Sequence, residues 1–110
     1  MSTRTPTPAQ VYHIYAGLCH RDTAGSITAF GFRAAFDFLE AGLRHQGIEG
    51  FTIQQATGVW NGVEEESIVV TVVSFGYEYE AVAKVCAAYK AHFKQEGVLL
   101  TKESVQATLI

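Results

Sequence analysis

The sequence has few cysteines, few prolines and no concentration of basic residues. Its 110 residues include 2 Cys and 2 Pro, and 8 Lys and Arg stand against 11 Asp and Glu, for a net charge of −3. Without a basic cluster, nucleic acid is not expected as a direct partner. Cys19 and Cys86 form no C-x-x-C pair. Cys86 lies on an apolar helical stripe, so we expect a buried thiol there.

Long apolar runs are also missing. No stretch approaches the roughly 20 residues that span a bilayer, so no membrane association is expected. Residues 1–10 are polar and show no signal peptide, and both prolines lie among them. We expect a loose N-terminal arm at residues 1–10 and one domain at residues 11–110, in a cytoplasmic protein. The content of 48% hydrophobic and 17% charged residues is that of a globular chain.

The spacing of apolar residues predicts four or five strands and two helices. In chain order we expect a strand at residues 11–18, a polar connection at 19–25, a helix from the N-cap Ser26 to Gly47, strands at 51–60 and 68–73, a helix at 79–96, and one or two strands within 98–110. The order β-α-β-β-α-β predicts a ferredoxin-like α+β fold, with two helices on one face of an antiparallel sheet.

Two segments carry more specific signals. Asn61-Gly62, between Trp60 and Val63, predicts a two-residue hairpin turn because both residues tolerate positive φ. The segment Ile68–Val73 is apolar almost throughout, without alternation, which predicts a strand covered on both faces. Two helices can cover only one face of the sheet, so this segment favours an oligomer.

Motifs for common chemistries are absent. None of His13, His20, His45 and His92 has a metal-ligand spacing with another His or Cys, and no P-loop, G-x-G-x-x-G or G-x-S-x-G occurs. We therefore expect neither a metal nor a cofactor.

Three polar or aromatic features remain, and for each of them an ordinary structural role, such as a frayed helix end for Gln95-Glu96, competes with a role in a binding site. The run Glu64–Glu66 is typical of a solvated hairpin flank that deters edge pairing. Gln95-Glu96 follows a predicted helix, where the helix dipole disfavours an acid unless a cation compensates it. Trp60 beside the turn is either a cross-strand packing residue or a surface on which a ligand base stacks.

These features occur together in a known family. The segments TIQQATGVWNGVEEESIVVTV and AVAKVCAAYKAHFKQEGVLLTKESVQATLI resemble the phage enzymes that degrade S-adenosylmethionine, formerly called hydrolases and now regarded as lyases. The shared positions are Thr57-Gly58, the aromatic Trp60, Glu65-Glu66, Gln95-Glu96, Lys102 and Ala107. The turn after Trp60 is shorter than in the coliphage enzymes, and Trp replaces their Tyr.

The resemblance implies a function and an assembly. It implies cleavage of S-adenosylmethionine to methylthioadenosine and homoserine lactone in the host cytoplasm, as a phage defence against restriction. It implies a fold like that of the nitrogen-regulatory PII proteins, with a homotrimer and ligand sites between subunits. The implied catalytic residues are Glu65, Glu66 and Glu96, and the implied substrate-binding residues are Gly58, Trp60 and Gln95. The alternatives are a PII-like trimer that binds adenine nucleotides without catalysis, and a small interaction domain without a ligand.

Strand geometry separates the two adjacent acids. If the Asn61-Gly62 turn has two residues, Glu65 lies on the same side of the hairpin as Trp60, and Glu66 points to the opposite side. We therefore predict different environments for the two carboxylates.

Overall fold

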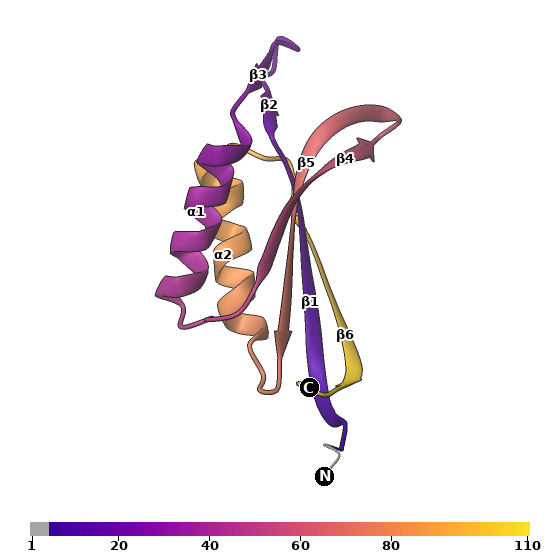
Figure 1. The fold of residues 1–110 in the computed structure, drawn as a ribbon. Helices are drawn as coiled ribbons and strands as arrows, with labels where there is room; N and C mark the ends of the chain where they lie inside the picture. Colours follow the sequence, from indigo (N-terminus) through magenta and orange to yellow (C-terminus); the bar gives the residue numbers. More distant parts are fainter. Residues whose placement is uncertain (1–4) are drawn as a thin grey trace.

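The computed structural model describes residues 5–110. Its elements are β1 (Thr7–Gly17), β2 (Cys19–Arg21), β3 (Ile27–Ala29), α1 (Phe32–His45), β4 (Thr52–Trp60), β5 (Val63–Ser74), α2 (Tyr79–His92) and β6 (Leu99–Ala107). The main sheet has the strand order β4-β5-β1-β6, and every neighbouring pair is antiparallel. The two helices lie side by side against one face of this sheet (Figure 1). The predicted β-α-β-β-α-β order is therefore confirmed, with β2 and β3 as an added two-stranded sheet.

The core lies between the helices and the facing side of the sheet. Ile14 of β1 pairs with Val70 of β5, and both side chains are fully buried. Leu39 of α1 and Val85 of α2 belong to the same cluster. Cys86 is also buried there, as predicted, and burial raises the pKa of its thiol to about 11. Helices and sheet thus share one continuous apolar interior.

The predicted double burial of Ile68–Val73 is not found within the chain. Ile68, Val70 and Val72 are buried beneath the helices, whereas Val73 on the other side of β5 is 48% exposed. We call this side of the sheet, opposite the helices, the open face. The radius of gyration is 15.7 Å, against about 13 Å for a compact chain of this length. The single chain therefore leaves apolar strand surface uncovered.

The N-terminal strand is longer than predicted. Thr7–Gln10, assigned above to a loose arm, belong to β1, where they pair with Ser104–Ala107 of β6. Ala9 is buried there. Pairing with β6 requires a partner almost a hundred residues away, so local composition did not reveal it. Residues 1–4 of the predicted arm lie outside the described part of the chain.

The first helix begins later than predicted, at Phe32 instead of after Ser26. The segment between forms the β2–β3 hairpin, whose turn is closed by Asp22. Its Oδ1 accepts hydrogen bonds from the backbone N–H groups of Ala24 (3.0 Å) and Ser26 (2.8 Å), and Gly25 has φ +86°. The Asp22 side chain thus stabilises a turn at the point where helical spacing alone indicated a helix start.

The second helix ends at His92, four residues earlier than predicted. Lys94 follows in the left-handed region with φ 54°, and the N–H of Gln95 donates to the carbonyl of Lys90 at 2.9 Å. This is the hydrogen bond of a Schellman motif, which usually has glycine where Lys94 stands. Glu96 therefore lies beyond the helix end, and the turn directs Gln95 back toward the sheet.

The hairpin between β4 and β5 confirms the turn prediction. Asn61 and Gly62 have φ values of 51° and 77°, and Trp60 pairs with Val63. The β4–β5 ribbon projects beyond the helices at the same end of the molecule as β2 and β3 (Figure 1).

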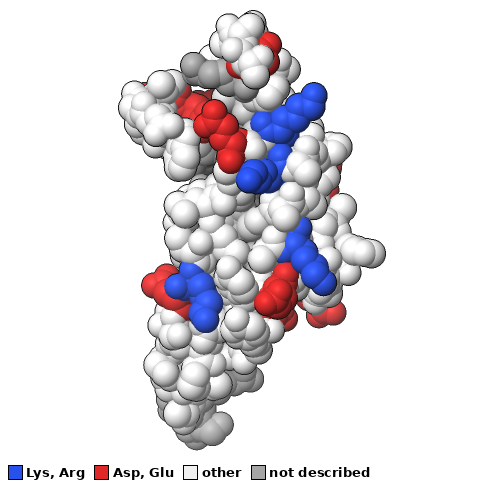
Figure 2. Space-filling model, turned by 180° about the vertical axis from the view of Figure 1, so that it is seen from behind, with Lys and Arg blue, Asp and Glu red and all other residues white. Residues whose placement is uncertain are grey.

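Neither helix among residues 5–110 is long and apolar enough to cross a bilayer. Among the residues coloured in Figure 2, Lys and Arg side chains are interspersed with acidic ones, and much of that face is uncharged.

We predict that Tyr89→Phe lowers the free energy of unfolding by about 1–2 kcal/mol, because it leaves a buried carbonyl without its donor. The Tyr89 hydroxyl donates to the Gly17 carbonyl at 2.7 Å inside the core. Burial, with the nearby Cys19 thiol, also raises the Tyr89 pKa well above its ordinary value of 10.

Urea titrations at several pH values measure both effects. Above about pH 10 the unfolded tyrosine ionises before the folded one, so the wild type loses stability with rising pH and Tyr89→Phe loses less. The exposed Tyr77→Phe is the matched control. Equal unfolding midpoints and equal pH slopes for all three proteins would contradict this role.

Candidate functional site

A pocket of about 560 Å³ lies on the open face, where the β4–β5 ribbon, the end of β1 and the α2–β6 connection meet. Its volume is in the range of small-molecule sites. The pocket is lined by Tyr15, Ala16, Gly17, Cys19, Ala56, Thr57, Gly58, Val59, Trp60, Asn61, Val63, Glu65, Ser67, Val69, Lys94, Gln95, Glu96, Gly97 and Leu99.

Hairpin register decides which acid reaches the pocket. Gly58 pairs with Glu65 and Trp60 with Val63, so these residues share one side of the ribbon. Glu65 lines the pocket and Glu66 does not. Glu66 lies on the other side of the ribbon, where its Oε2 accepts a hydrogen bond from Gln55 Nε2 at 3.2 Å. The predicted separation of the two acids is therefore confirmed.

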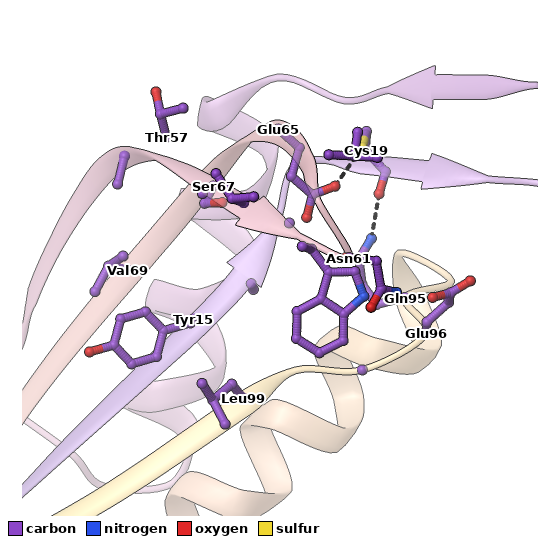
Figure 3. A pocket seen from close by; sticks show the side chains of 18 of the residues that line it. Tyr15, Cys19, Thr57, Asn61, Glu65, Ser67, Val69, Gln95, Glu96 and Leu99 are labelled. Carbon is purple, nitrogen blue, oxygen red and sulfur yellow. Dashed lines mark hydrogen bonds between the residues drawn. The ribbon is translucent and has the colours of Figure 1, made fainter.

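Glu65 and Gln95 are joined through Cys19. The Cys19 thiol donates to Glu65 Oε2 at 3.3 Å, and the Cys19 carbonyl accepts from Gln95 Nε2 at 2.8 Å (Figure 3). Gln95 Nε2 also donates to the Phe93 carbonyl at 3.2 Å. Both partners of the amide nitrogen are carbonyl acceptors, so Oε1 is the atom of this amide that can accept a hydrogen bond from a ligand.

The free sides of these two groups converge on Gly17. A Cβ built on Gly17 would lie 2.9 Å from Gln95 Oε1 and 3.0 Å from Glu65 Oε1. The two oxygens are therefore within about 6 Å of one another. Both are hydrogen-bond acceptors, since an ionised carboxylate and an amide oxygen donate nothing. Such a pair is suited to a ligand that brings N–H donors, and most of all to a cationic one.

The walls of the pocket are largely apolar. Tyr15 of β1, Val69 of β5 and Leu99 of β6 lie together on one side of it (Figure 3). Trp60 lines it too and remains 54% exposed, so its indole is accessible to a ligand. Flat aromatic and aliphatic surfaces of this kind stack on planar heterocycles.

The charged residues around the pocket are few. Among the described lining residues, Glu65 and Glu96 are acidic and Lys94 is basic. Glu65 is half-buried, whereas Glu96 and Lys94 are exposed at the rim. The Glu96 carboxylate points away from Glu65 (Figure 3). The lining therefore carries a net negative charge. Of its three charged side chains, Glu65 is the one partly shielded from solvent.

The structure brings together most of the residues singled out from the sequence. Gly58, Trp60, Glu65, Gln95 and Glu96 line one pocket, although about 35 residues of sequence separate the hairpin from Gln95. Glu66 is the exception, as described above. No group of three or more His, Cys, Asp or Glu residues placed to hold a metal occurs within residues 5–110.

Sequence reasoning missed the residues that β1 and β2 contribute. Tyr15, Gly17 and Cys19 line the pocket because β1 pairs with β5, and Gly17 stands opposite Ser67. No local motif marks them. Ser67 and Val69 had a usable signal, because the period of two along β5 places them on the same side as Glu65.

Comparison with solved structures relates the fold to proteins that bind adenine compounds. A phage SAM lyase in its apo state aligns with a TM-score of 0.66 and 19% identity, over 100% of this chain and 98% of that chain. The phage SAM lyase in complex with S-methyl-5′-thioadenosine aligns with a TM-score of 0.62 and 18% identity, over 97% and 96%. At these identities the likeness shows a shared fold.

A second group has the same fold. CPII, a nitrogen regulatory PII-like protein from Thiomonas intermedia K12 bound to ADP, AMP and bicarbonate, aligns with a TM-score of 0.60 and 15% identity, over 96% of this chain and 98% of that chain. The expected PII-like fold is therefore confirmed. No curated protein matches the sequence. A family profile matches residues 12–109, and the chain belongs to that family, described as "Protein of unknown function (DUF3574)".

Proposed function

We propose that this protein is a lyase that cleaves S-adenosylmethionine into methylthioadenosine and homoserine lactone. The observation that carries the proposal is the convergence of the Glu65 carboxylate and the Gln95 amide oxygen at the end of an apolar, aromatic-walled pocket. The fold shared with a phage SAM lyase, and the residues that resemble those enzymes in sequence, support the same assignment.

The charge of the pocket favours this substrate over a nucleotide. S-adenosylmethionine carries an ammonium, a sulfonium and a carboxylate, so its net charge is positive. ADP and AMP carry phosphates, which proteins usually bind with Arg, Lys and backbone N–H groups. Two acids and one lysine line the described pocket, and the lysine is at its rim. A cation is therefore the better electrostatic match.

The reaction needs no water and no cofactor. A carboxylate oxygen of the substrate attacks its own γ-carbon and forms the ring ester. The bond between that carbon and sulfur breaks, and its electron pair stays on sulfur, which becomes the neutral thioether of methylthioadenosine. Proton transfer is not required. The protein's task is to fold the substrate so that oxygen and carbon meet, which is catalysis by proximity.

The substrate's changing charge limits where an acid can help. The sulfonium loses its positive charge in the transition state, so a carboxylate held against sulfur would stabilise the ground state more and slow the reaction. The ammonium keeps its charge throughout. We therefore assign Glu65 and Gln95 Oε1 to the ammonium, and Trp60, Tyr15 and Leu99 to the adenine. Gly58 makes room for the Ser67 side chain beside Glu65, because a Cβ on Gly58 would lie 2.6 Å from Ser67 Oγ. We assign Glu96 to the pocket rim.

We further propose a homotrimer in which the open faces of three chains cover one another. Val73, which lies on this face and outside the pocket lining, is 48% exposed in the single chain. Burying such side chains yields about 25 cal/mol per Å² of apolar area. Glu66, on the other side of the β4–β5 ribbon, and the rim residue Glu96 are then available to a site completed by a neighbouring subunit.

One observation supports a second candidate, a PII-like module that binds adenine nucleotides without cleaving anything. Lys94 lies at the pocket rim, and the strained left-handed backbone that it occupies normally carries glycine. The Lys94 ammonium group is a cation of the kind that binds phosphates.

Incubation with S-adenosylmethionine tests the function directly. We expect methylthioadenosine together with homoserine lactone at early times, and free homoserine only later by slow hydrolysis of the lactone. Chromatography of a reaction run in ¹⁸O-labelled water separates the mechanisms. Early homoserine carrying solvent oxygen, without lactone, would replace the lyase with a hydrolase. Binding of ADP by calorimetry without turnover would favour the nucleotide module.

We predict that Glu65→Gln lowers kcat/KM for S-adenosylmethionine about a hundredfold, mainly through a higher KM, because it removes the charge that holds the substrate ammonium while keeping the shape of the side chain. Glu96→Gln should have a smaller effect, because that side chain is exposed. Glu64→Gln, on the exposed ribbon, is the silent control, and Glu66→Gln should differ from Glu65→Gln. Initial rates at saturating and limiting substrate measure this series. Full turnover with both Glu65 and Glu96 neutralised would refute the acidic site.

We predict that Val73→Asp gives a folded monomer, because a charge placed on the open face cannot be buried between chains without a large desolvation cost. Multi-angle light scattering should report a trimer for the wild type and for the control Ala87→Asp, which changes an exposed position on α2. A wild type that is monomeric at micromolar concentration would eliminate the trimer.

A further inference from the structure

Gly17 lies at the point where the two acceptor oxygens converge, and its backbone does not require glycine. Gly25, Gly47 and Gly62 have positive φ among the described glycines, and Gly17 does not. It is a buried residue at the end of β1, and glycine within a strand lowers the stability of the folded state by about 0.5–1 kcal/mol relative to alanine. Backbone geometry therefore offers no reason for a glycine here, and the reason lies in the space around it.

That space is filled by the ligand-binding groups themselves. The Cβ of an alanine would meet Gln95 Oε1 at 2.9 Å and Glu65 Oε1 at 3.0 Å, well inside ordinary contact distance. We propose that Gly17 is a positioning residue, whose missing side chain lets Glu65 and Gln95 close on the ligand ammonium. The assignment of the ammonium rests on the proposed function, whereas the steric part does not.

The backbone of β1 cannot move aside to relieve such a contact. The Gly17 carbonyl accepts the buried Tyr89 hydroxyl at 2.7 Å, and the N–H of Leu18 donates to the Glu66 carbonyl at 3.0 Å. Gly17 also pairs with Ser67 across the sheet. The strand is thus anchored to α2 on one side and to β5 on the other.

The side-chain ends are what must shift. Both atoms that would contact the new methyl group are terminal oxygens of flexible side chains. Gln95 is held by the Cys19 and Phe93 carbonyls, and Glu65 by the Cys19 thiol, so their displacement breaks these hydrogen bonds. The cost of Gly17→Ala therefore falls on the site, while the core of the fold is untouched.

The test compares Gly17→Ala with Gly50→Ala, a glycine without positive φ that has open space around it. We expect Gly17→Ala to fold and to lose at least tenfold in kcat/KM for S-adenosylmethionine, and Gly50→Ala to keep the wild-type value. The loss caused by Gly17→Ala should shrink severalfold in a Gln95→Ala background, because one clashing oxygen is then gone. Turnover by Gly17→Ala within twofold of wild type would overturn the inference.

Thermal unfolding tests the steric part without any substrate. Gly17→Ala is introduced into the wild type and into the Glu65→Ala/Gln95→Ala variant, and the resulting change in melting temperature is measured in each. We expect this change to be several degrees more favourable in the double variant, where the two clashing oxygens are gone. Equal shifts in both backgrounds would overturn the positioning role and leave a purely structural one. If the wild type does not cleave S-adenosylmethionine, the proposed function fails, and the unfolding comparison still decides about Gly17.

Discussion

The Glu65 carboxylate and the Gln95 amide oxygen, two acceptors that gain nothing from each other, are held against the same glycine. Three independent features of the fold produce this arrangement. The register of the β4–β5 hairpin turns Glu65 toward the open face, and the Schellman turn at Lys94 returns Gln95 to the sheet. Pairing of β1 with β5 then places Gly17 beneath both. Two acceptor oxygens that face one another cannot hydrogen-bond to each other, so both need a donor. A cationic ligand supplies such a donor.

The β2–β3 hairpin, an addition to the six-element fold, helps to hold Glu65 and Gln95 in place. Its first residue is Cys19, which contacts Glu65 through its thiol and Gln95 through its carbonyl. Phe30, just after β3, stacks on Phe93 with ring centroids 4.3 Å apart, and His20 bonds the Lys94 carbonyl through Nδ1 at 3.0 Å. The hairpin thus attaches the end of α2, and with it Gln95, to the strand that carries Gly17. Its removal would leave the fold's core intact and the acceptor pair unsupported.

Features that neighbouring residues determine, such as a hairpin turn or the alternation of a strand, could be predicted from the sequence. The Asn61-Gly62 turn and the period of β5 were enough to place Glu65 with Trp60 and to separate it from Glu66. Features set by distant partners were missed. Thr7–Gln10 became strand because β6 pairs with them, and the α1 start moved because Asp22 closes a turn. The role of Gly17 was invisible for the same reason, since it depends on two side chains that are remote in the chain.

We propose above all that the Glu65–Gln95 pair binds an ammonium group. Calorimetric titration with two unreactive adenosine thioethers tests it most directly. S-adenosylhomocysteine carries the ammonium and carboxylate, and methylthioadenosine lacks both. We predict that the wild type binds S-adenosylhomocysteine at least tenfold more tightly, and that Glu65→Gln abolishes this preference while leaving methylthioadenosine affinity unchanged. Equal affinity of the wild type for both ligands, or a preference that survives Glu65→Gln, would contradict the role of this pair.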